Sequence, residues 1–141
     1  MPIPYTIVCS ATIKANTPAY SEIPVNCVED PVRGAESSIQ RVYPIKIITI
    51  LVPTAPTTDY VVRVKKESVD GIIRPLADSI PASLINKLIT VSGQLPAVFT
   101  RNGRPALVYV APMEKLSIYI VNLASPSSDA NISFHLIAEK G

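Results

Sequence analysis

The sequence has few of the residues that enzymes use for chemistry near neutral pH. Its 141 residues include one histidine, His135, two cysteines and five glycines. A metal site would need two histidines, or one histidine with clustered carboxylates, and the acidic residues are scattered along the chain. Glycine-rich phosphate-binding loops and the G-x-S-x-G turn of hydrolases are absent. We therefore expect a protein that is not an enzyme, with no catalytic, cofactor-binding or metal-binding residues and no cofactor.

Charged residues are scarce as well. They make up 17% of the chain, against roughly 25% in an average domain, whereas 48% of the residues are hydrophobic. This balance is too apolar for a disordered protein. It leaves two interpretations: apolar surface is kept for contacts with other subunits, or the outer faces of a compact sandwich are covered with Thr, Ser and Tyr.

The basic residues form no long cluster, and the net charge is +2. The densest group is Arg63, Lys65 and Lys66; in a strand the first two share one face and the third falls on the other. Arg101 and Arg104 flank a turn. Nucleic-acid binding needs basic residues gathered on one face or groove. We interpret these positions as solvated strand residues that discourage edge-to-edge pairing, and we expect no specific nucleic-acid binding.

The two cysteines, Cys9 and Cys27, form no C-x-x-C pair, which excludes a zinc ribbon and a thioredoxin-type site. Cys9 lies in an apolar strand pattern, where a buried thiol acts as a small hydrophobic group. Two reduced thiols are the preferred interpretation, because nothing else in the sequence indicates an oxidising compartment. A disulfide between them, or a Cys–His pair with His135, stays open.

Long hydrophobic runs are also missing. The longest apolar run, Ile47–Val52, is interrupted by Thr49 and is far shorter than the roughly 18 residues that span a bilayer. The segment Met1–Tyr5 has neither the basic nor the apolar region of a secretory signal. We expect no transmembrane segment, and synthesis in the cytoplasm without a signal peptide.

Proline and alternating apolar residues are plentiful. The 14 prolines, close to twice the usual share of about 5%, stand mostly between apolar runs or at their ends, where a residue that cannot donate to a ladder is tolerated. Runs that alternate with a period of two predict strands. Together these features indicate an all-β fold: a single antiparallel β-sandwich, jelly-roll-like or Ig-like, that spans residues 1–141 and has eight to ten strands with at most one or two short helical turns.

The segments that we expect to be strands are Tyr5–Lys14, Glu22–Val28, Ile39–Val52, Asp59–Lys66, Ile72–Leu76, Lys87–Ser92, Ala97–Arg101, Arg104–Ala111, Lys115–Leu123 and Asn131–Ala138. Asp70-Gly71 and Asn102-Gly103 predict hairpins, because both dipeptides supply the positive φ values of a two-residue primed turn. Pro112–Lys115 predicts a third hairpin. Ser83–Lys87 predicts one helical turn, capped by Ser79 or Ser83.

The C-terminal third shows the alternation most clearly. Apolar side chains recur at every second position, first as Leu116, Ile118 and Ile120, then after a polar loop as Ile132, Phe134 and Leu136. We predict that these two sets form one buried face and that His135 lies on the opposite side of its strand. Tyr109 and Tyr119 are expected on neighbouring strands as a cross-strand pair.

The N-terminal segment Met1–Lys14 is apolar and β-prone, and the polar stretch Ala15–Tyr20 separates it from the next strand. Such a strand pairs within its own sandwich or completes the sheet edge of a neighbouring subunit, because ladder bonds are satisfied equally well in both cases. Residues 1–14 are therefore either the first strand of the domain, which is preferred, or an exchangeable arm. The loop Glu29–Ser38 is the other candidate contact region.

The segment Val110–Ile137 resembles a two-strand ending of small jelly-roll or Ig-like virion proteins. Its parts are a short turn with Pro112, an Ile/Tyr/Val strand that closes on Asn122-Leu123, a Ser-rich loop and a last strand. Such endings occur in coat, vertex, decoration and fibre subunits of viruses. The resemblance implies a structural subunit of a virion or other extracellular assembly, whose partners are identical subunits and other virion proteins. The alternative function is a β-sandwich that binds carbohydrate or peptide.

Overall fold

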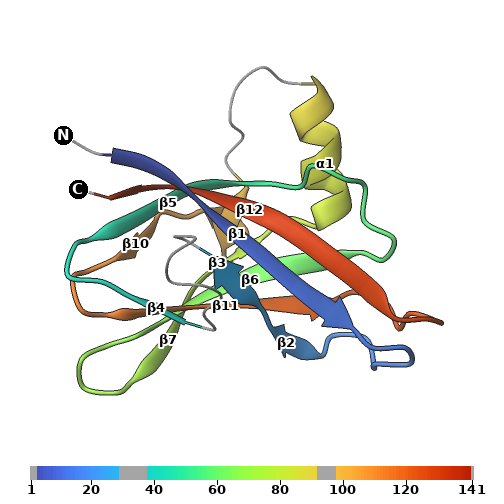
Figure 1. Ribbon diagram of the computed structural model, residues 1–141, viewed down its shortest axis with the longest axis horizontal. Helices are drawn as coiled ribbons and strands as arrows, with labels where there is room; N and C mark the ends of the chain where they lie inside the picture. The colour runs from blue at the N-terminus through green and yellow to red at the C-terminus, as the bar shows by residue number, and fades with distance from the viewer. Residues whose placement is uncertain (1–2, 29–37, 92–97, 141) are drawn as a thin grey trace.

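The computed structural model describes residues 3–28, 38–91 and 98–140, without the side chains of 89–91. In this part of the chain, strands and one helix form two antiparallel sheets that pack face to face (Figure 1). The expected all-β antiparallel sandwich is confirmed. Twelve strands form within the described residues, more than the eight to ten expected. Almost all of the loop Glu29–Ser38 lies outside the described residues.

One sheet has five strands, and two of these are the longest of the fold. β1 (Ile3–Ile13) and β12 (Ala130–Lys140) pair along their full length, so that the first and last described residues lie side by side (Figure 1). The remaining strands of this sheet are β5 (Ile45–Leu51) next to β12, β10 (Val108–Val110) next to β5, and β3 (Asn26–Val28) next to β1.

The other sheet has seven strands. Its central pair is β11 (Lys115–Asn122) with β6 (Tyr60–Glu67), followed outward by β7 (Ile73–Ser79), β8 (Phe99–Arg101) and β9 (Arg104–Pro105). Two short strands, β2 (Glu22–Pro24) and β4 (Ser38–Gln40), pair with opposite halves of the second edge of β11.

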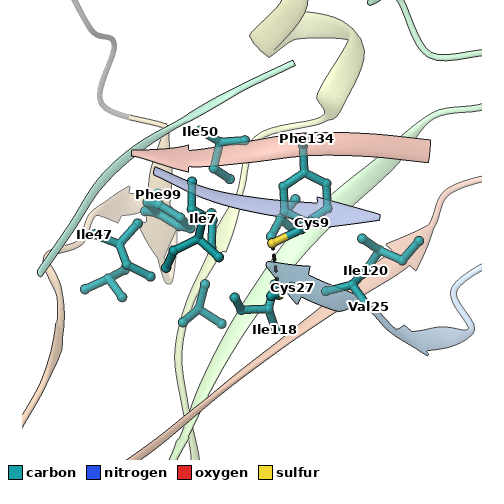
Figure 2. Packing of buried hydrophobic residues seen from close by; sticks show 14 of the residues in the cluster. Ile7, Cys9, Val25, Cys27, Ile47, Ile50, Phe99, Ile118, Ile120 and Phe134 are labelled. Atoms are coloured by element: carbon teal, nitrogen blue, oxygen red, sulfur yellow. Dashed lines mark hydrogen bonds between the residues drawn. The ribbon is translucent and has the colours of Figure 1, made fainter. Parts of the chain in front are cut away.

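The hydrophobic core lies between the two sheets. Ile7 and Phe134 enter it from the five-stranded sheet and Ile118 and Ile120 from the seven-stranded sheet, and all four are buried (Figure 2). The Phe134 ring lies 6.1 Å from the ring of Tyr60, which comes from the opposite sheet. Burial of large apolar side chains, at about 25 cal/mol per Å² of apolar area, supplies most of the stabilisation of such a sandwich.

The predicted core of the C-terminal third is confirmed in one respect and wrong in another. All six predicted side chains are buried: Leu116, Ile118, Ile120, Ile132, Phe134 and Leu136. They do not form one face, because β11 and β12 belong to different sheets and contribute opposite sides of the core. The polar loop between these strands carries the chain from one sheet to the other, and the period-two pattern is the same on both sides of that crossing.

Three predicted strands are each divided between the two sheets. Glu22–Val28 forms β2 and β3, Ile39–Val52 forms β4 and β5, and Arg104–Ala111 forms β9 and β10. At the first division Val25 is buried, and its amide donates to the carbonyl of Ile118. Each division lies at or beside a proline: Pro24, Pro44 and Pro105. Proline lacks the N–H that a ladder needs, so pairing within one sheet is interrupted near it. The apolar pattern continues along the chain, but the next residues pair in the other sheet.

Of the three predicted hairpins, two are confirmed. At Asn102-Gly103 both residues have positive φ, 53° and 77°, as a primed two-residue turn requires. The hairpin of β6 and β7 forms at Asp70-Gly71, but its predicted two-residue turn is wrong: the amide of Ser68 donates to the carbonyl of Ile72, so the loop has three residues and only its Gly71 has positive φ. Pro112–Lys115 is not a hairpin, because β10 and β11 lie in different sheets.

The helix α1 (Ala82–Val91) is longer than the single turn predicted at Ser83–Lys87, and it takes the place of the strand predicted at Lys87–Ser92 as far as Val91. Its buried Ala82 and Ile85 side chains pack where the helix meets β5 of one sheet and β6 of the other (Figure 1). The helix is too short to cross a membrane, and the described residues contain no other.

The cap of this helix is Asp59, not Ser79 or Ser83. The Asp59 carboxylate accepts hydrogen bonds from the amide of Ser83 (3.0 Å) and from its hydroxyl (2.9 Å). An acceptor at this position satisfies amides that have no partner within the helix. Ser79 instead uses its hydroxyl to accept a bond from the amide of Val62 on the neighbouring strand.

Candidate functional site

The outer surface of β1, β3 and β12 in the five-stranded sheet carries no carboxylate, ammonium or guanidinium group between its two ends. We call the following outward residues of β1, β3 and β12 the uncharged face: Thr6, Val8, Ser10, Thr12, Asn26, Val28, Asn131, Ser133, His135 and Ile137. Their neighbours along the strands, such as Ile7, Cys27 and Phe134, are buried in the core. Because side chains alternate along a strand, this burial fixes the uncharged face on the outside.

Opposite charges flank the uncharged face at both ends. Lys46 and Glu139 occupy paired positions on β5 and β12 at one end. At the other end the ammonium of Lys14 lies 3.7 Å from the carboxylate of Asp129. Between these pairs the surface consists of short neutral side chains, two of which, on β1 and β12, are joined by a 2.8 Å hydrogen bond from Thr12 to Asn131.

His135 lies within the uncharged face, opposite Val8 on one side and Leu51 on the other. It is partly exposed and its neighbours Phe134 and Leu136 are buried, so the predicted orientation of the histidine is confirmed. Cys9 points to the opposite side of the sheet, and the structure therefore does not assemble a Cys–His pair. Among the described residues, no three His, Cys, Asp or Glu side chains gather to form a metal site.

The two cysteines lie opposite each other on β1 and β3. Their Sγ atoms are 3.0 Å apart inside the core, and both are free thiols (Figure 2). Burial, assisted by the neighbouring Cys27, raises the pKa of the Cys9 thiol. A thiol that stays protonated is neither a nucleophile nor a metal ligand. The pair therefore serves as a small hydrophobic contact that joins the edge strand β3 to β1.

We expect both thiols to be reactive after unfolding and unreactive before it. Native protein mixed with a coloured disulfide reagent such as DTNB should release almost no thiolate, because Cys9 and Cys27 are shielded in the core. The same protein in concentrated guanidinium should release two equivalents. If no thiolate is released in guanidinium without a reductant, the two cysteines form a disulfide instead. If the native protein reacts quickly with DTNB, the burial of the pair is contradicted.

The outer surface of the seven-stranded sheet carries a network of charges instead. Arg63 on β6 donates to Asp78 (2.9 Å) and to Glu22 (3.0 Å), and Lys65 also binds Glu22. Burial would raise the pKa of Glu22, but the hydrogen bonds and charges of Lys65 and Arg63 outweigh it and lower the pKa. The hydrogen bond to Asp78 is the main cause that raises the pKa of Arg63. The shifts keep Glu22 and Arg63 ionised at neutral pH.

The predicted pair of Tyr109 and Tyr119 is wrong. Tyr109 lies opposite Lys46 in the five-stranded sheet. Tyr119 lies in the seven-stranded sheet, where the ammonium of Lys65 is 4.6 Å from the centre of its ring. This arrangement is a cation–π contact between two half-buried side chains, which typically contributes about 0.5–2 kcal/mol.

A groove of about 700 Å³ lies beside the charge network, at the point where β8 separates from β7. Arg63, Lys65 and Arg101 all line it. The structure thus brings together basic residues that the sequence places in two separate groups, whereas Lys66 points away and contacts Glu114 (3.4 Å). The spacing of these residues gave no signal for the groove, because their proximity depends on how β6, β7 and β8 are ordered.

Comparisons of the chain with protein-family models, with curated proteins and with solved structures find no match. The uncharged face on one sheet and the charged groove on the other are the two surface features that distinguish the molecule.

Proposed function

We propose that the protein is a non-enzymatic structural subunit that self-assembles, and that the uncharged face is its contact surface. The observation that carries the proposal is that three neighbouring strands present ten outward residues, with no Asp, Glu, Lys or Arg, between the charged pairs at the two ends. The centres of interfaces between identical subunits are depleted of charge in the same way, because burying an unpaired charge is costly. A second copy of the chain is therefore the partner that we propose.

The face alone is small for a stable pair. With about 3.3 Å per residue along a strand and about 4.8 Å between strands, its seven positions on three strands measure roughly 23 Å by 14 Å. Two copies packed on this area alone would bury less than the roughly 1,200 Å² of a specific, stable interface, so the contact that we propose extends beyond these three strands. Such a contact uses the same surface on both copies and closes as a pair.

The resemblance of Val110–Ile137 to the ending of virion subunits supports a place for such pairs in a viral capsid, as coat, vertex, decoration or surface-filament protein. A pair that closes on itself does not propagate. A shell or filament therefore needs a second contact, to identical subunits or to other virion proteins, through surfaces outside the uncharged face.

One charge placed in the uncharged face should dissociate the assembly. Ser133 is exposed at a position opposite Ser10. We expect both Ser133→Lys and Ser133→Glu to raise the concentration needed for self-association by about tenfold or more, since a charge of either sign would lose its hydration in the contact. Light scattering after size-exclusion chromatography over a range of protein concentrations measures this change, and negative-stain microscopy shows the particles.

Ser128→Lys is the matched control, because Ser128 is exposed in the loop before β12 and lies outside the face. It should assemble like the unmodified protein. All three variants should keep the free energy of unfolding within about 0.5 kcal/mol, as surface substitutions usually do. An unmodified chain that stays monomeric at high concentration, in both high and low salt, would contradict the proposal and favour a ligand-binding module.

A further inference from the structure

The edge of β7 beside the groove is open. Residues Ile73–Ala77 pair with β6 on one side, but in the described part of the chain no strand pairs with them on the other side, because β8 reaches only Asp78 and Ser79. The side chain of Ile73 is 61% exposed. Pro75 has no amide N–H and the register shifts beside Leu76, but the other residues of this edge have backbone amide and carbonyl groups with which another strand can pair.

Two arginines stand opposite each other in the hairpin that forms one wall of the groove. Arg101 and Arg104 are paired positions of β8 and β9, so their side chains lie on the same face of the hairpin. Like charges directly opposite each other destabilise a strand pair. Both residues are exposed, and neither side chain has a hydrogen bond or ion pair among the described residues. This unpaired positive charge indicates an anionic partner outside the chain.

The remaining cations of the groove are already compensated. Arg63 and Lys65 are held by Glu22 and Asp78. The free positive charge therefore belongs to the hairpin, where Arg101 lines the groove and Arg104 stands opposite Arg101 outside the lining. The opposite wall is the open edge of β7 with the apolar side chains of Ile73 and Leu76. A ligand that fits both walls must combine negative charge, apolar groups and a backbone able to pair with a strand.

We propose that this groove binds an extended, acidic segment of a partner protein as an added strand along β7. The backbone of the segment pairs with the open edge, as in other complexes formed by strand addition. Side chains of such a segment alternate in direction. Carboxylates on one side therefore meet Arg101 and Arg104, where arginine binds carboxylate with two parallel hydrogen bonds.

A peptide suits the groove better than a single-stranded nucleic acid does. Nucleic acids bind to positively charged tracks with aromatic side chains on which the bases stack. None of the described residues that line the groove is aromatic, and its uncompensated charge is confined to one wall. The open edge of β7 offers hydrogen-bonding groups that match a peptide backbone and have no counterpart in a sugar–phosphate chain.

The test uses a fluorescein-labelled nine-residue peptide of alternating Glu and Val, and fluorescence anisotropy as the readout. We expect saturable binding to the whole protein. The double substitution Arg101→Ala with Arg104→Ala should weaken binding about tenfold or more, as truncating charged contacts does. Lys14→Ala is the control, because Lys14 is an exposed cation that follows β1 of the other sheet and does not line the groove. It should bind the peptide as the unmodified protein does.

Two further probes separate strand addition from simple charge attraction. The same peptide with alternate amides N-methylated keeps its charge but cannot form a ladder, and it should not bind. A twelve-residue oligothymidylate should not compete with the acidic peptide. Equal binding of the methylated peptide, competition by the oligothymidylate or failure of the acidic peptide to bind would each overturn the proposal. Thermal melts should show that the arginine variants remain folded, because removing two opposed like charges does not weaken the hairpin.

Discussion

Replacing Phe134 with alanine is expected to lower the free energy of unfolding by about 3–5 kcal/mol, as large-to-small aromatic substitutions in cores do. Phe134 is fully buried at the middle of β12 (Figure 2). Its ring lies 6.1 Å from the Tyr60 ring of the other sheet. β12 is held between β1 and β5, so the strand cannot move inward to fill the cavity. Urea unfolding followed by circular dichroism gives the change.

His135→Ala is the matched control for this prediction, because the two residues are adjacent on the same strand and point to opposite sides of the sheet. The histidine is partly exposed on the uncharged face, and its loss should cost less than about 1 kcal/mol. If His135→Ala proves the more damaging of the two, the orientation of β12 is wrong, and a structural or functional role of the histidine inside the protein has to be considered.

The sequence predicts which side chains of a strand point into the core, but it does not predict which strands pair with each other. The period-two pattern correctly placed Phe134 inside and His135 outside, because alternation is a local property of the backbone. It did not show that β11 and β12 lie in different sheets, since both sheets bury the same kind of side chain. The division of Glu22–Val28 at Val25 was missed for the same reason: its apolar pattern continues while the strand changes its partner.

The helix shows how distant contacts decide a local structure. The β-branched residues around Ser83–Lys87 favour strand over helix, and the sequence near the helix start offers serines as caps. The structure uses Asp59 as the cap, a residue that comes 24 positions earlier than Ser83 and reaches it through two hydrogen bonds. Burial of Ile85 against both sheets then stabilises the helix. Neither contact can be read from a short window of sequence.

The uncharged face and the groove also differ in how far the sequence alone predicts them. The uncharged face follows from composition and alternation, and the scarcity of charge already indicated either subunit contacts or a neutral Thr- and Ser-rich exterior. The groove requires knowledge of the strand order, because Arg63 and Arg101 meet across β6, β7 and β8. The opposition of Arg101 and Arg104, by contrast, could be predicted from the Asn102-Gly103 turn, which fixes the register of the hairpin.

Deletion of residues 1–14 is expected to unfold the protein. β1 lies between β12 and β3, and it pairs with β12 over all eleven of its residues. Ile7, Cys9 and Ile13 are fully buried in the core. Without this strand, β12 would expose one edge and part of the core would open to water. Circular dichroism and a thermal melt of the truncated protein measure the loss, and deletion of Met1 and Pro2 alone is the control that should leave both unchanged.

The same experiment tests whether the N-terminal strand is exchanged between subunits. In an exchanged assembly the register of β1 on β12 would be identical, since the ladder bonds do not depend on which chain supplies the strand. A truncated protein that stays folded, loses its oligomeric state and binds an added peptide of residues 1–14 would show that the strand comes from a neighbour. Unfolding of the truncated protein would instead show that each chain needs its own first strand to close its core, and assembly would then depend on surface contacts such as the uncharged face.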